Sequence, residues 1–349
     1  MLASYGLTAA IKLASNESPF PPLPQVEQAI TDHLSGLNRY PDGAARVLRA
    51  ALADRHGTDP GRIAVGNGSC EIIQHSGEAL LDPGTTVVHA HPSFAMYPHL
   101  AAAAGADGVA VPLAPDGGHD LDAMAAAVDE RTRLVIICNP NNPTGVYRSA
   151  DDIERFLGLV PDDLAVLVDE AYYDFVQNPD RGRVAVLART RPNLLVTRTF
   201  SKAYGLCGLR VGYAVGCEEW VAALDAVRQP FNTNHLAQVA AIEGLRHPAA
   251  IQKRVDEAIS ERERVSDSLT DMHVPFTRSQ GNFILMEPPG SHVDAAALHE
   301  DLLRRGVIVR NGAALGCAGS LRVTIGAPSE NDAFLAALAA AVGTFASAE

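Results

Sequence analysis

The chain has 349 residues, 47% of them hydrophobic and 20% charged, and its formal net charge at pH 7 is −13. This length exceeds the size at which one hydrophobic core normally stops growing, so we expect one large domain and one smaller domain. The acidic balance and the lack of any cluster of Lys and Arg argue against nucleic acid as a partner, and the lack of an apolar run of 18 or more residues argues against a membrane-spanning helix.

The start of the chain is expected to be extended. Residues 1–25 contain Pro19, Pro21, Pro22 and Pro24, which suit neither a helix interior nor a central strand, so this segment should run over the surface. The first 20 residues also lack the basic start and apolar stretch of a signal peptide, which favours a cytoplasmic location.

Residues 26–230 are predicted to form the large domain. Between residues 60 and 216, short strand-like runs alternate with stretches of helical length, and the runs at 85–88, 134–138, 164–168 and 194–197 are apolar or β-branched throughout. Strands of this kind are buried on both faces, as in a mostly parallel sheet covered by helices. The sequence therefore predicts an α/β fold.

Residues 231–349 are predicted to form a smaller α+β domain. Helical segments at roughly 235–270 precede short strands near 282–286, 306–310 and 321–325, and an Ala-rich helix follows from about Ser329. The five cysteines of the chain form no CxxC pair and lie in apolar or Gly-rich stretches, so we expect reduced thiols and no metal site.

A Gly-rich turn between a strand and a helix is the first candidate site. The string Gly66-Asn67-Gly68-Ser69-Cys70-Glu71 follows the strand-like residues 63–65, and a helix N-terminus presents unpaired backbone N–H groups to an anion. Read alone, the turn is more often only a tight connection with Ser69 as the helix N-cap.

Two further motifs follow buried strands. The string NPNNPTG at residues 139–145 predicts a rigid loop at a strand's carboxyl end, where α/β sheets bind ligands, although such a string can also be a simple turn. Asp169, in the string DEAY, ends another buried strand and should need a cationic partner unless it caps a helix, and Tyr172 could bring a phenol to the same place.

The fourth motif places a lysine among small residues after a strand. Lys202, in Thr199-Phe200-Ser201-Lys202-Ala203-Tyr204-Gly205, is a candidate for desolvation, which lowers the pKa of the amine and frees it to form an imine. Thr199, Ser201 and Arg210 add hydroxyl donors and a forked cation suited to a phosphate. A lone Ser-Lys pair would carry no such meaning.

Together the four motifs resemble fold-type I pyridoxal-phosphate (PLP) aminotransferases. The strings NPNNPTG, DEAY, TFSKAYGLCGLRVGYA and LRVTIG are similar to those of the histidinol-phosphate aminotransferase family, including its actinobacterial aromatic-amino-acid branch, from about Ile11 to Asp332. The resemblance implies an aspartate-aminotransferase-like fold and transfer of an amino group between histidinol phosphate or an aromatic amino acid and 2-oxoglutarate.

The resemblance also implies roles for individual residues. Lys202 would form the Schiff base with PLP and move the proton, Asp169 would pair with the pyridinium nitrogen, and Asn142 and Tyr172 would donate to the phenolic oxygen O3′. The other implied contacts, taken in the same way from the family, are Ser69, Cys70, Thr199, Ser201 and Arg210 to the phosphate, Phe94 stacked on the ring, Tyr40 to the phosphate from the partner of a homodimer, and Asn16, Arg310 and Arg322 to the substrate.

The chain departs from the family pattern at several points. Cys70 stands where relatives often carry Asp, Phe94 replaces the common Tyr, and the chain begins closer to residues 14–17 than is usual. Phe94, residues 15–17 and residues 230–232 look closer to the aromatic branch. A PLP-dependent decarboxylase of a phosphorylated amino acid is the rival reaction, and a non-catalytic binding module, which would be expected to have lost Lys202 or Asp169, is a further alternative.

Overall fold

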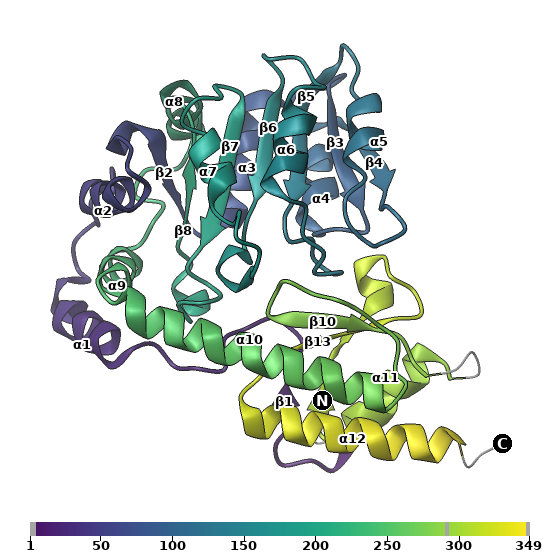
Figure 1. The fold of residues 1–349 in the computed structure, drawn as a ribbon. Helices are drawn as coiled ribbons and strands as arrows, with labels where there is room; N and C mark the ends of the chain where they lie inside the picture. The colour runs from purple at the N-terminus through teal and green to yellow at the C-terminus, as the bar shows by residue number, and fades with distance from the viewer. Residues whose placement is uncertain (1–4, 290–292, 347–349) are drawn as a thin grey trace.

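The structure, a computed structural model, describes residues 5–289 and 293–346. Its larger part is built around a seven-stranded sheet of order β2-β8-β7-β6-β5-β3-β4 (Figure 1). These strands are β2 (Ile63–Gly66), β3 (Thr86–His91), β4 (Asp107–Pro112), β5 (Thr132–Cys138), β6 (Ala165–Asp169), β7 (Leu194–Thr199) and β8 (Gly212–Val215). Strand β8 is antiparallel to β2 and β7, and the other neighbours are parallel, so the predicted α/β fold is confirmed.

Helices cover both faces of this sheet, which explains why its central strands are apolar throughout. Helices α3 (Ser69–Leu80), α4 (Met96–Ala104) and α8 (Glu218–Val227) pack on one face, and α5 (Leu121–Ala126), α6 (Ala150–Leu157) and α7 (Arg183–Leu187) pack on the other. Val135 and Ile136, neighbours in β5, point to opposite cores and are both fully buried. Each such side chain stabilises the fold by about 1.5–3 kcal/mol.

The smaller part contains an antiparallel sheet of order β12-β13-β10-β9. Its strands are β9 (Phe276–Thr277), β10 (Phe283–Met286), β12 (Arg310–Asn311) and β13 (Leu321–Thr324), and its helices are α10 (Pro248–Asp271), α11 (Ala295–Arg304) and α12 (Pro328–Ala346). Apolar side chains of β10, β13, α11 and α12 share one core with the second half of α10, which makes this an α+β unit.

Two segments contact parts of the molecule other than those implied by the predicted boundaries after residues 25 and 230. Strand β1 (Ile11–Lys12), within the predicted N-terminal segment, pairs with β11 (Val307–Ile308) of the smaller part. Helix α9 (His235–Leu245), predicted to belong to the small domain, packs against α1 (Pro24–His33) and α2 (Arg46–His56) of the larger part. We therefore propose that the domain boundary runs along α10, which leads from α9 to the smaller core (Figure 1).

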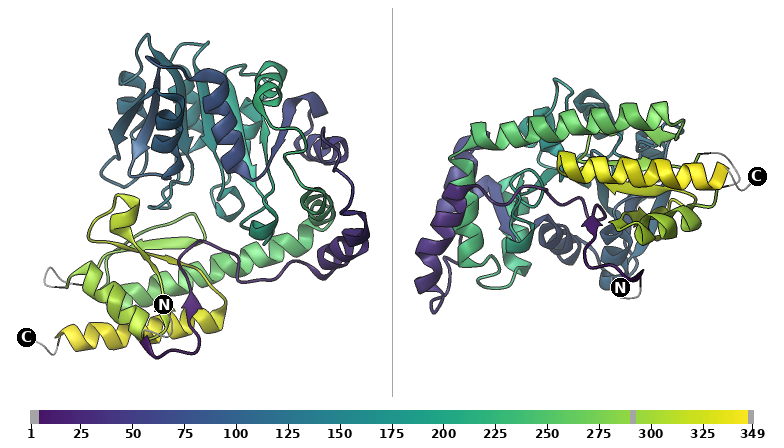
Figure 2. Two further views of the ribbon diagram at one scale, coloured as in Figure 1. Left: turned by 180° about the vertical axis from the view of Figure 1, so that it is seen from behind. Right: turned by 90° about the horizontal axis from the view of Figure 1, so that it is seen from below.

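The segment between β1 and α1 joins the two parts. Both views of Figure 2 show it running along α10, from the small sheet to the edge of the larger part. Residues 13–23 of this segment form neither helix nor strand, and Leu23 has an extended backbone. Pro24 then occupies the first turn of α1, where its fixed φ and missing N–H are tolerated. Residues 1–4 and 347–349 of the predicted first and last ranges lie outside the described residues.

Candidate active site

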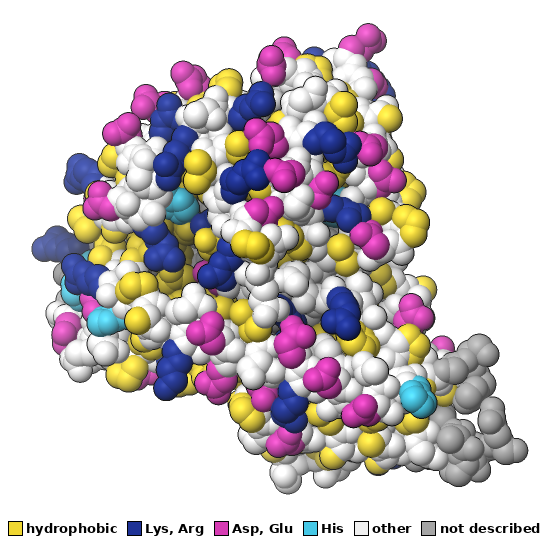
Figure 3. All heavy atoms as spheres, viewed as in Figure 1, with side chains coloured by type: hydrophobic (Ala, Val, Ile, Leu, Met, Phe, Trp, Pro, Cys, Tyr) yellow, Lys and Arg dark blue, Asp and Glu magenta, His cyan; other side chains and the backbone are white. Residues whose placement is uncertain are grey.

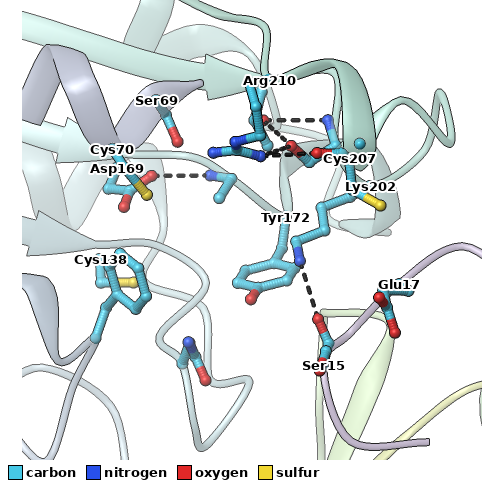
Figure 4. A pocket seen from close by; sticks show the side chains of 16 residues that line it. Ser15, Glu17, Ser69, Cys70, Cys138, Asp169, Tyr172, Lys202, Cys207 and Arg210 are labelled. Carbon is cyan, nitrogen blue, oxygen red and sulfur yellow. Dashed lines mark hydrogen bonds between the residues drawn. The ribbon is translucent and has the colours of Figure 1, made fainter. Parts of the chain in front are cut away.

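A cavity of about 440 Å³ lies where three strands of the large sheet end (Figure 4). Cys138, Asp169 and Thr199 are the last residues of β5, β6 and β7, and all three line it. The carboxyl ends of parallel strands meet at one sheet edge, which is the usual place of ligand sites in such folds. The predicted residues that line it are Ser69, Cys70, Phe94, Asn142, Asp169, Tyr172, Thr199, Ser201, Lys202 and Arg210.

Asp169 is a buried carboxylate that faces the cavity without a cation beside it. It is 3% exposed and accepts hydrogen bonds from the Tyr97 hydroxyl at 3.0 Å, the Thr197 hydroxyl at 3.3 Å and the Ala171 backbone N–H at 3.2 Å. Within the described part of the chain it forms no ion pair, and burial raises its pKa to about 6 against the opposing effect of the Tyr97 hydrogen bond. A protonated ring nitrogen of a ligand would supply the missing cation.

Lys202 supplies an amine on the other side of the cavity. Its Nζ donates to the backbone carbonyl of Ser15 at 3.4 Å and lies 5.6 Å from the centre of the Tyr172 ring. Burial, and then the positive charge of Arg322, lower the pKa of Lys202 to about 8. A neutral amine is therefore accessible near neutral pH, as imine chemistry requires.

The start of α3 and the start of β8 form a cradle for an anion. Gly68 precedes α3 with φ of 84°, and a Cβ there would collide with the Arg210 guanidinium. A Cβ on Gly212 would collide with the backbone N of Ser69, so the first N–H groups of α3 sit directly against β8. These N–H groups have no partner within the helix and face the Arg210 side chain, which suits a phosphate.

Hydroxyl groups complete this cradle. Thr199 Oγ1 donates to Ser201 Oγ at 2.9 Å, and Arg210 donates to Ser201 Oγ at 3.4 Å and to the carbonyl of Cys207 at 3.0 Å. Ser69 is the first residue of α3 and makes no capping hydrogen bond, so the alternative in which it serves only as an N-cap is wrong.

A hydrogen-bond chain connects the cavity to the small domain. Asn16 Nδ2 donates to the Tyr172 hydroxyl at 3.0 Å, which leaves the phenol proton free to be donated elsewhere. Burial raises the pKa of Tyr172 to about 12, so the phenol keeps that proton. Arg322 donates to Asn142 Oδ1 at 2.5 Å and to the carbonyl of Ala14 at 2.8 Å, and its Nε has no partner among the described residues.

Four predicted residues do not line the cavity of this chain: Asn16 and Arg322, which the hydrogen bonds above link to it, and Arg310 and Tyr40. Arg310 is exposed on β12 opposite Arg322 in the sheet register, and it does not line the cavity. Tyr40 is 80% exposed and stacks on Phe231, with ring centres 4.5 Å apart.

Sequence reasoning missed Tyr97, Ser15 and Glu17. Tyr97 is fully buried, contacts the Phe94 ring edge-on at 5.8 Å and binds Asp169. The sequence carries this contact only as a spacing of three residues: the Tyr97 backbone N–H donates to the Phe94 carbonyl at 3.2 Å in the turn that leads into α4, which brings the two rings together. Ser15 and Glu17 reach the cavity because Asn16 between them adopts a left-handed conformation with φ of 51°, which the sequence does not announce.

The sequence matches one family model over most of its length. The family model described as "Aminotransferase class I and II" matches residues 8–338. The chain belongs to this family. The expected PLP-dependent aminotransferase is thereby confirmed, and the buried Asp169 carboxylate, the Lys202 amine and the anion cradle fit that cofactor.

Two groups of relatives resemble this aminotransferase over most of its length. The histidinol-phosphate aminotransferase of Brevibacillus brevis is 42% identical over 334 residues, which are 96% of this chain and 91% of the relative. The aromatic amino acid aminotransferase of Rhodococcus jostii is 46% identical over 327 residues, which are 94% of this chain and 89% of the relative.

Solved structures confirm the aspartate-aminotransferase-like fold. The histidinol-phosphate aminotransferase of Sinorhizobium meliloti, in complex with pyridoxal-5′-phosphate, matches with a TM-score of 0.90 and 28% identity, covering 98% of this chain and 93% of that one. The aspartate aminotransferase of Thermus thermophilus matches with a TM-score of 0.86 at 24% identity, covering 95% and 92%. Among the described residues, no helix combines the length and apolar character needed to span a bilayer.

Proposed function

We propose that this aminotransferase moves the amino group of histidinol phosphate or an aromatic amino acid to 2-oxoglutarate. The observation that carries the proposal is that two groups face each other across one cavity. One is the buried carboxylate of Asp169, which has no cationic partner among the described residues, and the other is the amine of Lys202, whose pKa is lowered by burial. The names of the relatives from Brevibacillus brevis and Rhodococcus jostii supply the two donor classes.

PLP, when bound, supplies an electron-withdrawing ring that stabilises negative charge developing at the substrate's α-carbon. Asp169 would keep the ring nitrogen protonated, because its carboxylate is held anionic by the Tyr97 and Thr197 hydroxyls. Tyr172 and Asn142 would donate to O3′. Ser69, Cys70, Thr199, Ser201 and Arg210 would hold the phosphate, and Phe94 would stack on the ring.

Lys202 is the residue that we propose as the base. Its Nζ would take the proton from the α-carbon of the bound donor and deliver it to C4′ of the cofactor. This proton transfer distinguishes transamination from loss of the carboxylate. Arg322 would bind an α-carboxylate or the phosphate of histidinol phosphate through two nitrogens: Nε, which has no partner among the described residues, and Nη1, once it is released from Asn142. Asn16 and Arg310 would be further substrate contacts.

The proposed active unit is a homodimer in the cytoplasm. Exposed apolar side chains occur on and near α1 and α2, and at the left of Figure 3, where these helices lie, hydrophobic side chains are visible among Lys, Arg and His side chains. The residues of this apolar patch are Leu34, Leu37, Tyr40, Val47 and Phe231. Patches of this kind mark interaction surfaces, and a second copy covering this one would bring its Tyr40 to the cradle.

The test is a panel of single-turnover reactions followed by the absorbance of the bound cofactor. Histidinol phosphate, phenylalanine and glutamate should each convert the cofactor to its amino form in the wild type, and Lys202→Ala should abolish conversion while retaining cofactor without a covalent link. The measurement also separates the rival reaction. An α-keto acid from phenylalanine or glutamate, and a ketone from histidinol phosphate, support transamination, whereas release of carbon dioxide from phenylalanine or glutamate contradicts it. Reductive trapping on another lysine would refute the assignment of Lys202.

A further inference from the structure

A second carboxylate lines the cavity at the end far from Asp169. Among the described residues, Glu17 and Asp169 are the acidic side chains that line it. Figure 4 shows Glu17 beside Ser15 and the Lys202 amine, whereas Asp169 lies across the cavity near Ser69 and Cys70. The Glu17 charge acts on Lys202, since it counteracts part of the lowering of the lysine's pKa that burial and Arg322 cause. Glu17 therefore stands where the substrate, rather than the cofactor ring, would lie.

The backbone around Glu17 is fixed, so its side chain has a defined position. Asn16 donates its backbone N–H to the Thr324 hydroxyl at 2.8 Å and its side chain to Tyr172 at 3.0 Å. Leu13, three residues earlier, pairs with Ile308 of the small sheet through a 2.8 Å hydrogen bond. The left-handed turn at Asn16 then directs Ser15 and Glu17 to the cavity.

The carboxylate of Glu17 has one ion-pair partner that it can exchange for a ligand. Glu17 Oε1 lies 2.9 Å from Lys12 Nζ, and the two side chains are 39% and 54% exposed. An ion pair this exposed contributes little, because water screens it and two long side chains must be ordered to hold it. A ligand group that donates a hydrogen bond in a less exposed geometry can therefore compete with Lys12 for Glu17.

The chemistry of Glu17 discriminates between the two donor classes. A carboxylate accepts hydrogen bonds and repels other anions, so it does not suit an α-carboxylate, a phosphate or a distal carboxylate. It suits an imidazole, which presents a ring N–H and becomes more basic beside a negative charge. A benzene ring offers no such donor.

We propose that Glu17 accepts a hydrogen bond from the imidazole ring of the amino donor and so selects imidazole-bearing donors over those with a benzene ring. This inference rests on the proposed function, because it assumes that both classes of donor enter this cavity. It deepens that function by naming the group that sets the preference.

The experiment measures kcat/KM for histidinol phosphate and for phenylalanine in the wild type, Glu17→Gln and Lys12→Gln. Glu17→Gln keeps the shape of the side chain and removes its charge, so kcat/KM for histidinol phosphate divided by that for phenylalanine should fall by about 10-fold. The change should come mainly from a higher KM for histidinol phosphate, because a hydrogen bond to a charged group is weakened. Lys12→Gln breaks the same ion pair but keeps the carboxylate, so the ratio should stay within about 2-fold of the wild type.

An unchanged ratio in Glu17→Gln would overturn the inference, and so would an equal fall in Lys12→Gln, which would assign the effect to the ion pair itself. A wild type that converts phenylalanine but not histidinol phosphate would also overturn it, while leaving the aminotransferase function intact. A wild type that converts neither donor and does not convert glutamate would instead refute the proposed function.

Discussion

Burial in the cavity favours the neutral forms of two ionisable side chains, Asp169 and Lys202. It raises the pKa of Asp169 to about 6 and lowers that of Lys202 to about 8, so each charge costs free energy before a ligand arrives. A protonated ring nitrogen beside Asp169 and a covalent link at Lys202 would remove both costs. Part of the binding energy of the cofactor would thus come from relief of these two unfavourable states.

The first prediction concerns the cost of Asp169 in the protein without cofactor. Because its folded-state pKa lies above the unfolded value, the folded state binds more protons between pH 4 and pH 6, and stability falls as the pH rises through this window. Asp169→Asn has no such group, so between pH 4 and pH 7 the wild type should lose on the order of 2–3 kcal/mol relative to the variant. Urea unfolding of both apoproteins at each pH checks this, and parallel pH profiles would contradict it.

The second prediction concerns Tyr97, which donates to Asp169 while touching Phe94. Tyr97→Phe keeps the ring and removes the hydroxyl, so the carboxylate loses a donor that favours its charged form. We expect the affinity for PLP to fall by about 10-fold, corresponding to about 1.5 kcal/mol for a hydrogen bond to a charged group.

Fluorescence titration of the apoprotein with PLP measures the effect of Tyr97→Phe. Thr197→Val is the matched control, because the Thr197 hydroxyl donates to the same carboxylate at the longer distance of 3.3 Å. Its effect on affinity should be smaller. A loss in Thr197→Val as large as that in Tyr97→Phe would argue against a special role for the tyrosine.

At the scale of elements, the sequence predicted the strands that carry the site but not the contacts between distant segments. The apolar runs located β5, β6 and β7, and with them the positions of Cys138, Asp169 and Thr199 at one sheet edge. Local patterns suffice there, because a strand buried on both faces has a distinctive composition. The resemblance to a family then supplied the individual roles, which composition alone would not give.

Long-range pairing explains what the sequence did not predict. Strand β1 pairs with β11, almost 300 residues later, and its two residues carry no recognisable strand pattern. The position of Glu17 in the cavity depends on this pairing and on the positive φ of Asn16, a conformation that non-Gly residues adopt infrequently. Helix α9, placed in the small domain by its position in the sequence, packs against α1 and α2, because its sequence shows that it is helical and not which core it joins.

The third prediction tests the close approach of β8 to α3. A methyl group on Gly212 would meet the backbone N of Ser69 and the carbonyl carbon of Gly68, and backbone atoms cannot move aside as a flexible side chain can. Gly212→Ala should therefore displace the start of α3, weaken PLP binding by 10-fold or more, and cost about 1–3 kcal/mol of stability.

Gly216→Ala is the control for Gly212→Ala. Gly216 directly follows β8, and its added methyl would meet the side chain of Leu195 at 2.7 Å instead of the cradle. We expect a loss of stability without a matching loss of PLP affinity. Equal losses of affinity in the two variants would show that strain in the sheet, rather than the position of α3, sets cofactor binding.

At the scale of the whole molecule, the apolar patch around Tyr40 is the feature that a single chain does not explain. Tyr40 is 80% exposed although it stacks on Phe231, which is itself 43% exposed, and Leu37 is 56% exposed. Large apolar side chains grouped in this way cost free energy in water and are typical of surfaces that another protein covers. A symmetric dimer would bury the patch of each copy, and it would carry Tyr40 to the phosphate cradle of its partner.

The fourth prediction tests whether the active sites are composite. Tyr40→Ala and Lys202→Ala should each be inactive or nearly so, the first through loss of a phosphate contact from the partner and the second through loss of the amine. In a hybrid dimer one site carries both substitutions and the other carries neither. After free exchange of equal amounts, half of the dimers are hybrids with one intact site, so activity should recover to about a quarter of the wild-type value. Co-purification of differently tagged subunits establishes that exchange has occurred. No recovery despite exchange would place Tyr40 in the site of its own chain, and full activity in a monomer would refute the dimeric site.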